Sequence, residues 1–165
     1  MDLGADVFPP RLYGTDSEVR RVSAGLLLCT LPRAEWTHEA HLAAVSALIL
    51  EKPDIRLEQE LPGIISRYNE SVGGVNDDTQ GYHETLTQFW LANARAFHAA
   101  HPQGSLVERV NAFIICEDGH RDAALRYFSR AHLFSVEARR RLVEPDLMPF
   151  PWSPLSGNPD DPRAA

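Results

Sequence analysis

Cysteine is scarce in this sequence. Only Cys29 and Cys116 occur among 165 residues, and each follows an apolar run. Two thiols without metal-type spacing make neither a disulfide framework nor a zinc ribbon, and a buried free cysteine usually behaves as a small apolar side chain. The chain also lacks an apolar run near the roughly 20 residues that a membrane-spanning helix needs. Its first ten residues lack the basic start and apolar core of a secretory signal. These absences predict a soluble, cytoplasmic protein.

Positive charge is scarce as well. The 16 basic side chains are outnumbered by 23 acidic ones, which gives a formal net charge of −7. A phosphate backbone or an anionic membrane surface would be repelled by such a chain, so we expect neither nucleic acid nor a membrane as a partner. A small-molecule ligand is the expected partner, and association into a homodimer is left open.

Helical periodicity is the main pattern that the sequence does contain. Strand-like alternation and internal repeats are absent, and 44% of the residues are apolar. The length fits one domain with a single core, so residues 1–148 predict an all-α, single-domain bundle of six to seven helices. Residues 149–165 are rich in proline and predict an extended or disordered tail, with Phe150 and Trp152 holding its first part to the body. The expected helices cover about 16–29, 34–51, 57–72 with a kink or delayed start at Pro62, 82–100, 105–116, 121–129 and 135–142.

The segment from Glu35 to His41 places two histidines on an apolar stripe of the second expected helix. At 100° per residue, His38 and His41 share an arc of roughly 120° with apolar residues, and Glu35 extends that arc on one side. The apolar members of the arc are Leu42, Val45, Leu48 and Ile49. An imidazole has two polar nitrogens, and a buried polar group needs a partner. The stripe therefore indicates a candidate functional site.

A third histidine is expected beside the first two. Short connections make consecutive helices antiparallel, so the second and fourth helices should be parallel, with their first turns at one end of the bundle. His83 lies in the first turn of the expected helix 82–100. The loop 73–81 should lie at the same end, where Asp78 or Thr79 could cap that helix. Its polar residues, which we expect to contact a substrate, are Asn76, Asp77 and Asp78.

Three imidazoles at one place predict a metal site formed by His38, His41 and His83. Residues three apart on a helix have Cβ atoms roughly 5 to 6 Å apart, so both imidazoles can reach one ion. A three-histidine site leaves a coordination position open for water or substrate. The ion would be divalent zinc, iron, copper or manganese, because imidazole ligands do not decide among them. No organic cofactor is expected.

Glu35 has three alternative roles at such a site: a fourth ligand, an acceptor that fixes a histidine tautomer, or a general base. Glu84 is a weaker candidate ligand, which could instead interact with the helix dipole. Tyr82 is either a core residue or a phenol that orients a substrate or acts as an acid.

The leading hypothesis is a metal-dependent enzyme that acts on a small molecule. With zinc it would be a hydrolase or lyase, in which metal-bound water attacks or removes a proton with Glu35 as base; with a redox metal it would be an oxidoreductase. Two helix N-termini at one place would suit a carboxylate-bearing or enolate-forming substrate bound beside the metal. The alternative is a metal-free module that binds a small anion or a partner, with the histidines as structural core residues. A purely structural subunit is a third hypothesis.

Several blocks of the sequence resemble a family of small bacterial proteins for which no activity is established. The blocks are Trp36 to Leu42, Tyr68 to Gly73, Asn76 to Thr85 and Val143 to Leu147. A looser similarity is to metal-binding helical bundles of the DinB type, which place three histidines at a bundle end. In this sequence the His-x-x-His pair falls early in the chain, unlike that pattern, so the similarity concerns architecture alone.

Overall fold

The structure, a computed structural model, describes residues 9–151. Within that range it contains seven α-helices and no strand, which confirms the all-α prediction. No helix in the described range is long and apolar enough to cross a membrane. The helices are α1 (Asp16–Leu27), α2 (His38–Glu51), α3 (Leu57–Ser71), α4 (Glu84–Ala100), α5 (Leu106–Ile115), α6 (Arg130–Leu133) and α7 (Val136–Arg140). Short 3-10 turns are η1 (Arg33–Glu35), η2 (Glu117–Gly119) and η3 (Ala123–Arg126).

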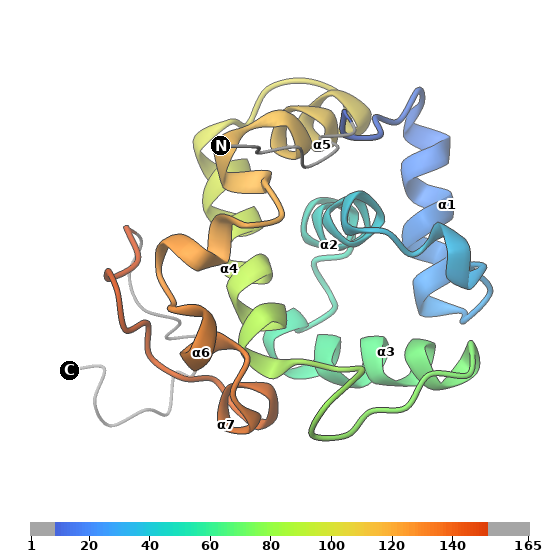
Figure 1. The fold of residues 1–165 in the computed structure, drawn as a ribbon. Helices are drawn as coiled ribbons and strands as arrows, with labels where there is room; N and C mark the ends of the chain where they lie inside the picture. The colour runs from blue at the N-terminus through green and yellow to red at the C-terminus, as the bar shows by residue number, and fades with distance from the viewer. Residues whose placement is uncertain (1–8, 152–165) are drawn as a thin grey trace.

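Helix α2 is the centre of the fold. It packs against α1, α4 and α5, which surround it in Figure 1. Every residue from Leu42 to Leu48 is buried, so the helix is covered on all sides rather than along one stripe. A helix that is apolar all round requires such a position.

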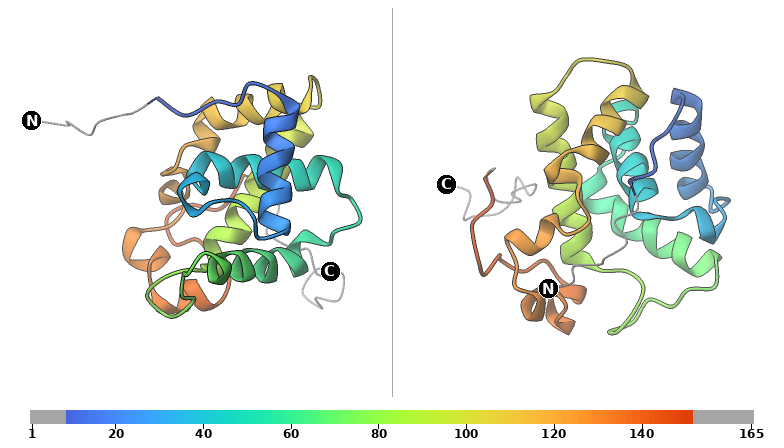
Figure 2. Two further views of the ribbon diagram at one scale, coloured as in Figure 1. Left: turned by 90° about the vertical axis from the view of Figure 1, so that its right-hand side faces the viewer. Right: turned by 45° about the horizontal axis from the view of Figure 1, so that its top comes forward.

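Helices α2 and α4 cross steeply, so the prediction that they are parallel is wrong. Figure 1 views α2 nearly along its axis, whereas α4 runs up the page; in the left view of Figure 2, α2 lies across the page and α4 still runs upward. Ridges of side chains pack into grooves at several crossing angles, and a central helix wrapped by others does not require bundle geometry.

The starts of α2 and α4 differ from the predicted ones. The Thr37 hydroxyl accepts a hydrogen bond from the amide of Ala40 at 3.2 Å, so α2 begins at His38 and Glu35 belongs to the separate turn η1. Helix α4 begins at Glu84, and its cap is neither aspartate nor threonine. The cap is His83, whose Nδ1 accepts the amide N–H of Leu86 at 3.1 Å.

The C-terminal helices are shorter than expected. The segment 121–129 forms the turn η3 instead of a helix, and α6 follows it from Arg130. Helix α7 covers the middle of the range 135–142. Helix α5, in contrast, begins close to the predicted start of the helix 105–116, with a capping box formed by Ser105 and Glu108.

Helix α3 runs through Pro62 and is not delayed by it. A proline inside a helix has no N–H to bond the carbonyl four residues earlier, which here belongs to Glu58. The Gln88 side chain of α4 donates to that carbonyl at 3.2 Å. The bond satisfies the freed carbonyl and ties α3 to α4.

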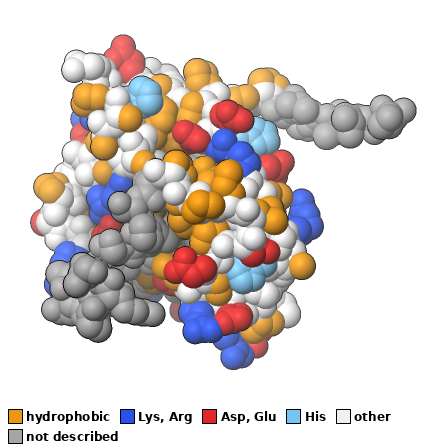
Figure 3. Space-filling view, turned by 90° about the vertical axis from the view of Figure 1, so that its left-hand side faces the viewer, with side chains coloured by type: hydrophobic (Ala, Val, Ile, Leu, Met, Phe, Trp, Pro, Cys, Tyr) orange, Lys and Arg blue, Asp and Glu red, His pale blue; other side chains and the backbone are white. Residues whose placement is uncertain are grey.

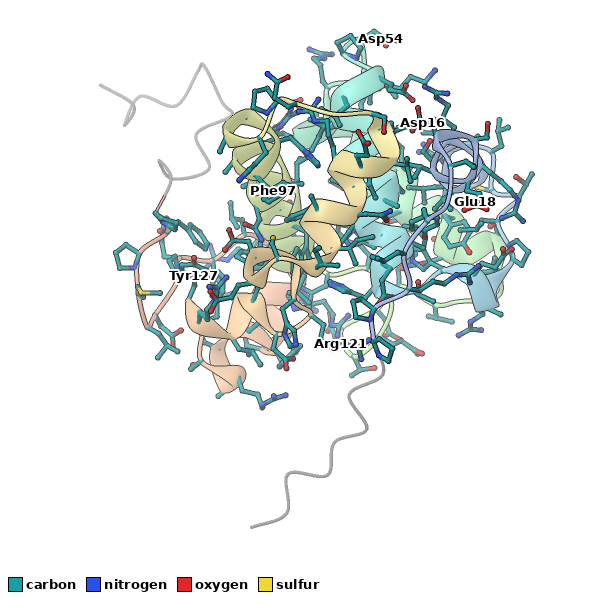
Figure 4. All side chains as sticks on the ribbon, turned by 90° about the horizontal axis from the view of Figure 1, so that it is seen from above. Asp16, Glu18, Asp54, Phe97, Arg121 and Tyr127 are labelled. Carbon is teal, nitrogen blue, oxygen red and sulfur yellow. The ribbon has the colours of Figure 1, made fainter. Side chains whose placement is uncertain are left out.

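Helix α5 closes the upper side of the molecule, as Figure 4 shows from above. The Asp16 carboxylate, at the start of α1, accepts the backbone N–H of Val107 at 2.8 Å. Phe97 of α4 packs on Phe113 of α5 with ring centroids 5.0 Å apart. These contacts complete the enclosure of α2.

The first part of the C-terminal segment packs on the helical body through Phe150. Its ring lies 5.9 Å from that of Phe89, 5.2 Å from Tyr127 and 5.7 Å from Phe128. Figure 3 looks onto this side of the molecule, where apolar side chains gather. The predicted contact of Phe150 is therefore present; Trp152 and the rest of the predicted tail lie outside the described residues.

Candidate functional site

A pocket of about 550 Å³ lies where the first turns of α2 and α4 meet the C-terminal half of α3. The segment from Arg33 to His41 forms one wall, and residues of α3, the loop 74–82 and the first turns of α4 form the rest. His38, His41 and His83 all line this pocket. The structure thus brings the three histidines to one cavity, although by crossed helices rather than parallel ones.

His38 holds the pocket wall to the turn η2. Its Nε2–H donates to the backbone carbonyl of Gly119 at 2.8 Å, and its ring meets that of Trp90 edge-on at 5.0 Å. Burial lowers the pKa of His38 below its usual value. The imidazole is therefore neutral at pH 7 and links segments 81 residues apart.

His83 uses both ring nitrogens inside the protein. Its Nε2–H donates to the carbonyl of Leu133 at 2.8 Å, while Nδ1 accepts the N–H of Leu86 at 3.1 Å. The two bonds fix one neutral tautomer. Burial lowers the pKa of His83, which favours this neutral form.

His41 differs from the other two histidines. No described residue forms a hydrogen bond with its imidazole, which meets the Trp36 ring edge-on at 5.6 Å. Burial, with a smaller contribution from His38, lowers the pKa of His41 to about 4. At pH 7 it is a neutral imidazole on the pocket wall, able to donate or accept one hydrogen bond to a ligand.

The three imidazoles do not present a common set of metal ligands in this arrangement. His83 would have to release one of its two hydrogen bonds to coordinate an ion, and His38 already uses Nε2. In residues 9–151 no group of three or more histidine, cysteine, aspartate or glutamate side chains is placed to hold a metal. The metal site stays a prediction, and the geometry gives it no support.

Glu35 lies away from this pocket. Its carboxylate pairs with the Arg21 guanidinium at 2.9 and 3.1 Å, which lowers the pKa of Glu35. The pair lines a neighbouring cavity of about 190 Å³. Glu35 therefore contacts none of the three histidines through a hydrogen bond, because η1 directs it to α1.

The polar residues predicted to bind substrate instead shape the loop before α4, and none of them lines the pocket. Asn76 accepts the N–H of Tyr82 at 2.9 Å and donates to the carbonyl of Ser66 at 3.1 Å. Asp77 accepts the backbone N–H of Thr79, and Asp78 pairs with Arg140 of α7 at 2.6 Å. These contacts hold the loop against α3 and α7.

Tyr82 lines the pocket, but its phenol is occupied. The hydroxyl donates to the Glu84 carboxylate at 2.5 Å. Burial, followed by the bond to Glu84, raises the pKa of Tyr82 far above its usual value. The phenol therefore keeps its proton at neutral pH. Glu84 is bonded to Tyr82 and to Gln88 rather than to a histidine.

Two side chains of the wall were missed as site residues from the sequence. Arg33 and Trp36 belong to the short connection between Pro32 and the cap Thr37, whereas the predicted helix 34–51 placed Trp36 inside a helix, on a different face from the two histidines. Their position in the sequence could have indicated their role, because residues just before a helix cap lie beside the N-terminus of that helix.

No family model, curated protein or solved structure matches the chain. The function therefore has to be argued from the pocket itself.

Proposed function

We propose that this protein binds a small organic molecule in the pocket between α2, α3 and α4, without a metal ion. The observation that carries the proposal is His41, a neutral imidazole on the wall of a 550 Å³ cavity with no hydrogen-bond partner among the described residues. Ligand sites are concave, mostly apolar and supplied with a few polar groups. A polar group without a hydrogen-bond partner on such a wall favours a ligand that supplies that hydrogen bond.

Binding is better supported than catalysis. A general base works best when its pKa lies near the working pH. With a pKa of about 4, His41 is a weak base at pH 7. Tyr82 keeps its proton, and the Glu35 carboxylate is paired with Arg21 outside the pocket. The remaining polar groups suit recognition of a molecule rather than its conversion.

The proposal can be tested by ligand-observed NMR with a library of small fragments. Val72 lines the pocket from the end of α3, so Val72→Trp should fill part of the cavity. The matched control is Val136→Trp, at a 44% exposed valine of α7 that does not line the pocket. We expect fragments that bind the wild-type protein and Val136→Trp to lose binding to Val72→Trp.

Circular dichroism of both variants checks that they keep the helical fold. If every fragment that binds the wild-type protein binds a folded Val72→Trp variant equally well, the pocket is not the binding site. If no fragment binds the wild-type protein at millimolar concentration, the proposed function is wrong.

A further inference from the structure

We infer that the ligand is a small organic monoanion, a carboxylate on an apolar body, with Arg33 binding the carboxylate. This inference rests on the proposed function and adds the chemical class of the ligand. It follows from an inventory of charges, donors and acceptors along the pocket wall.

Arg33 is the one described pocket-lining residue with a formal charge at neutral pH, since the histidines there are neutral. Its guanidinium forms no ion pair or hydrogen bond with a described residue. Several other arginines are paired, such as Arg21 with Glu35 and Arg140 with Asp78, whereas Arg11 and Arg67, like Arg33, form no ion pair with a described residue; of these three, Arg33 alone lines the pocket. An unpaired guanidinium at a pocket offers several N–H donors to a carboxylate.

The residues beside Arg33 add further donors. The indole N–H of Trp36 has no acceptor among the described residues, and the neutral imidazole of His41 meets the Trp36 ring. Indole nitrogen can only donate, and a neutral imidazole has one N–H. This side of the pocket therefore has donors in excess, and an anionic oxygen supplies the missing acceptors.

Many polar groups on the opposite wall form hydrogen bonds within the protein. Asn69 donates to Asn76 at 3.2 Å, Gln80 donates to Asp77 at 3.3 Å, and His83 has both nitrogens bonded. These bonds hold the loop in place and leave apolar surface for the body of the ligand. That surface comes from Ile65, Val72, Val75, Leu86 and Trp90.

Nearby acids do not cancel the positive charge of Arg33. Glu84 accepts hydrogen bonds from Tyr82 and Gln88, Glu35 pairs with Arg21, and neither acid lines the pocket. The caps of α2 and α4, Thr37 and His83, both lie on the wall, so the positive ends of two helix dipoles add to the potential there. The pocket lining thus contains one cation and no acid, which favours a ligand with a single negative charge.

The size of the cavity sets the size of the anion. A volume of about 550 Å³ lies in the range of roughly 300 to 1,000 Å³ that is usual for small-molecule sites, so the cavity has room for a two-ring aromatic carboxylate. The probes are therefore 2-naphthoate, its neutral isostere 2-naphthamide, and the cation 2-naphthylmethylammonium. Isothermal titration calorimetry at pH 7.5 measures each affinity for the wild-type protein, Arg33→Gln and the control Arg67→Gln. Arg67 is an exposed arginine outside this pocket.

We expect the wild-type protein to bind the naphthoate at least tenfold more tightly than the amide or the ammonium ion. Arg33→Gln should weaken naphthoate binding about tenfold and change amide binding less than twofold, while Arg67→Gln changes neither. Both sites are exposed, so both variants should fold.

Three results would overturn the inference: an amide that binds as tightly as the naphthoate, an unchanged naphthoate affinity in Arg33→Gln, or no binding of any probe. In each case the proposed function stands if the NMR screen yields fragments whose binding is lost in Val72→Trp. It fails with the inference if that screen yields no fragment, or if every fragment binds the folded Val72→Trp variant equally well.

Discussion

The protonation of His41 gives the most direct physical test of the pocket wall. Burial lowers its pKa from 6.5 to about 4. As the pH falls below 6.5, the unfolded chain binds a proton at this residue while the folded protein does not. The free energy of unfolding must therefore decrease between pH 6.5 and pH 4, and it keeps the full contribution of neutral His41 above pH 6.5.

The magnitude follows from the two pKa values. A difference of 2.5 units corresponds to about 3.4 kcal/mol when the pH lies below both. At pH 5 the loss relative to pH 8 is about 2 kcal/mol, because much of the unfolded chain's proton binding has then occurred. His38, His83 and His98 also have lowered pKa values and act in the same direction, so the wild-type curve contains several contributions.

The variant His41→Gln isolates one contribution. Urea unfolding followed by circular dichroism gives the free energy of unfolding of both proteins at pH 8, 7, 6 and 5. The substitution has its own cost at pH 8, but we expect the difference between the two proteins to change by about 2 kcal/mol in favour of the variant by pH 5. The control is His120→Gln, which replaces an exposed imidazole outside the pocket.

A difference that stays constant from pH 8 to pH 5 would refute the reasoning. It would mean that His41 accepts a proton in the folded protein as easily as in the unfolded chain. The imidazole would then be hydrated, and His41 would not be a buried, neutral side chain that lacks a hydrogen-bond partner.

Two further predictions concern metal binding and the loop before α4. Protein purified without a histidine tag should contain far less than one metal ion per chain by elemental analysis; near-stoichiometric metal that disappears in a His38→Ala/His83→Ala variant would instead support the metal site. Gly81→Ala should lower the free energy of unfolding by about 3 kcal/mol, because Gly81 has φ +78° and an added Cβ would overlap the carbonyl oxygen of Val75. Gly73→Ala is the matched control, with φ +84° and open space, and should cost about 1 kcal/mol. If thermal denaturation gives equal losses of stability for the two variants, the loop rearranges to accommodate the added methyl group at Gly81.

Local patterns in the sequence were enough to predict most of the helices. A capping box at Ser105 begins α5, the Thr15 side chain caps α1 by accepting the N–H of Glu18, and Pro53 follows the end of α2. Such signals depend on residues within one helical turn, so they can be found without the rest of the fold. The same local view failed at Pro62, because the group that satisfies the freed carbonyl comes from another helix.

The sequence by itself determined that this protein is all-α and that histidines lie at the starts of two of its helices. Only the tertiary structure decided what each histidine does. The His38 ring bonds a carbonyl 81 residues away and the His83 ring one 50 residues away, whereas the imidazole of His41, on the same helix as His38, has no hydrogen bond to any described residue. Helical periodicity fixes the face on which a side chain lies, but its hydrogen-bond partner depends on how distant segments pack. Because of that packing, two of the three predicted metal ligands, His38 and His83, form structural hydrogen bonds, and Arg33 lies on the pocket wall.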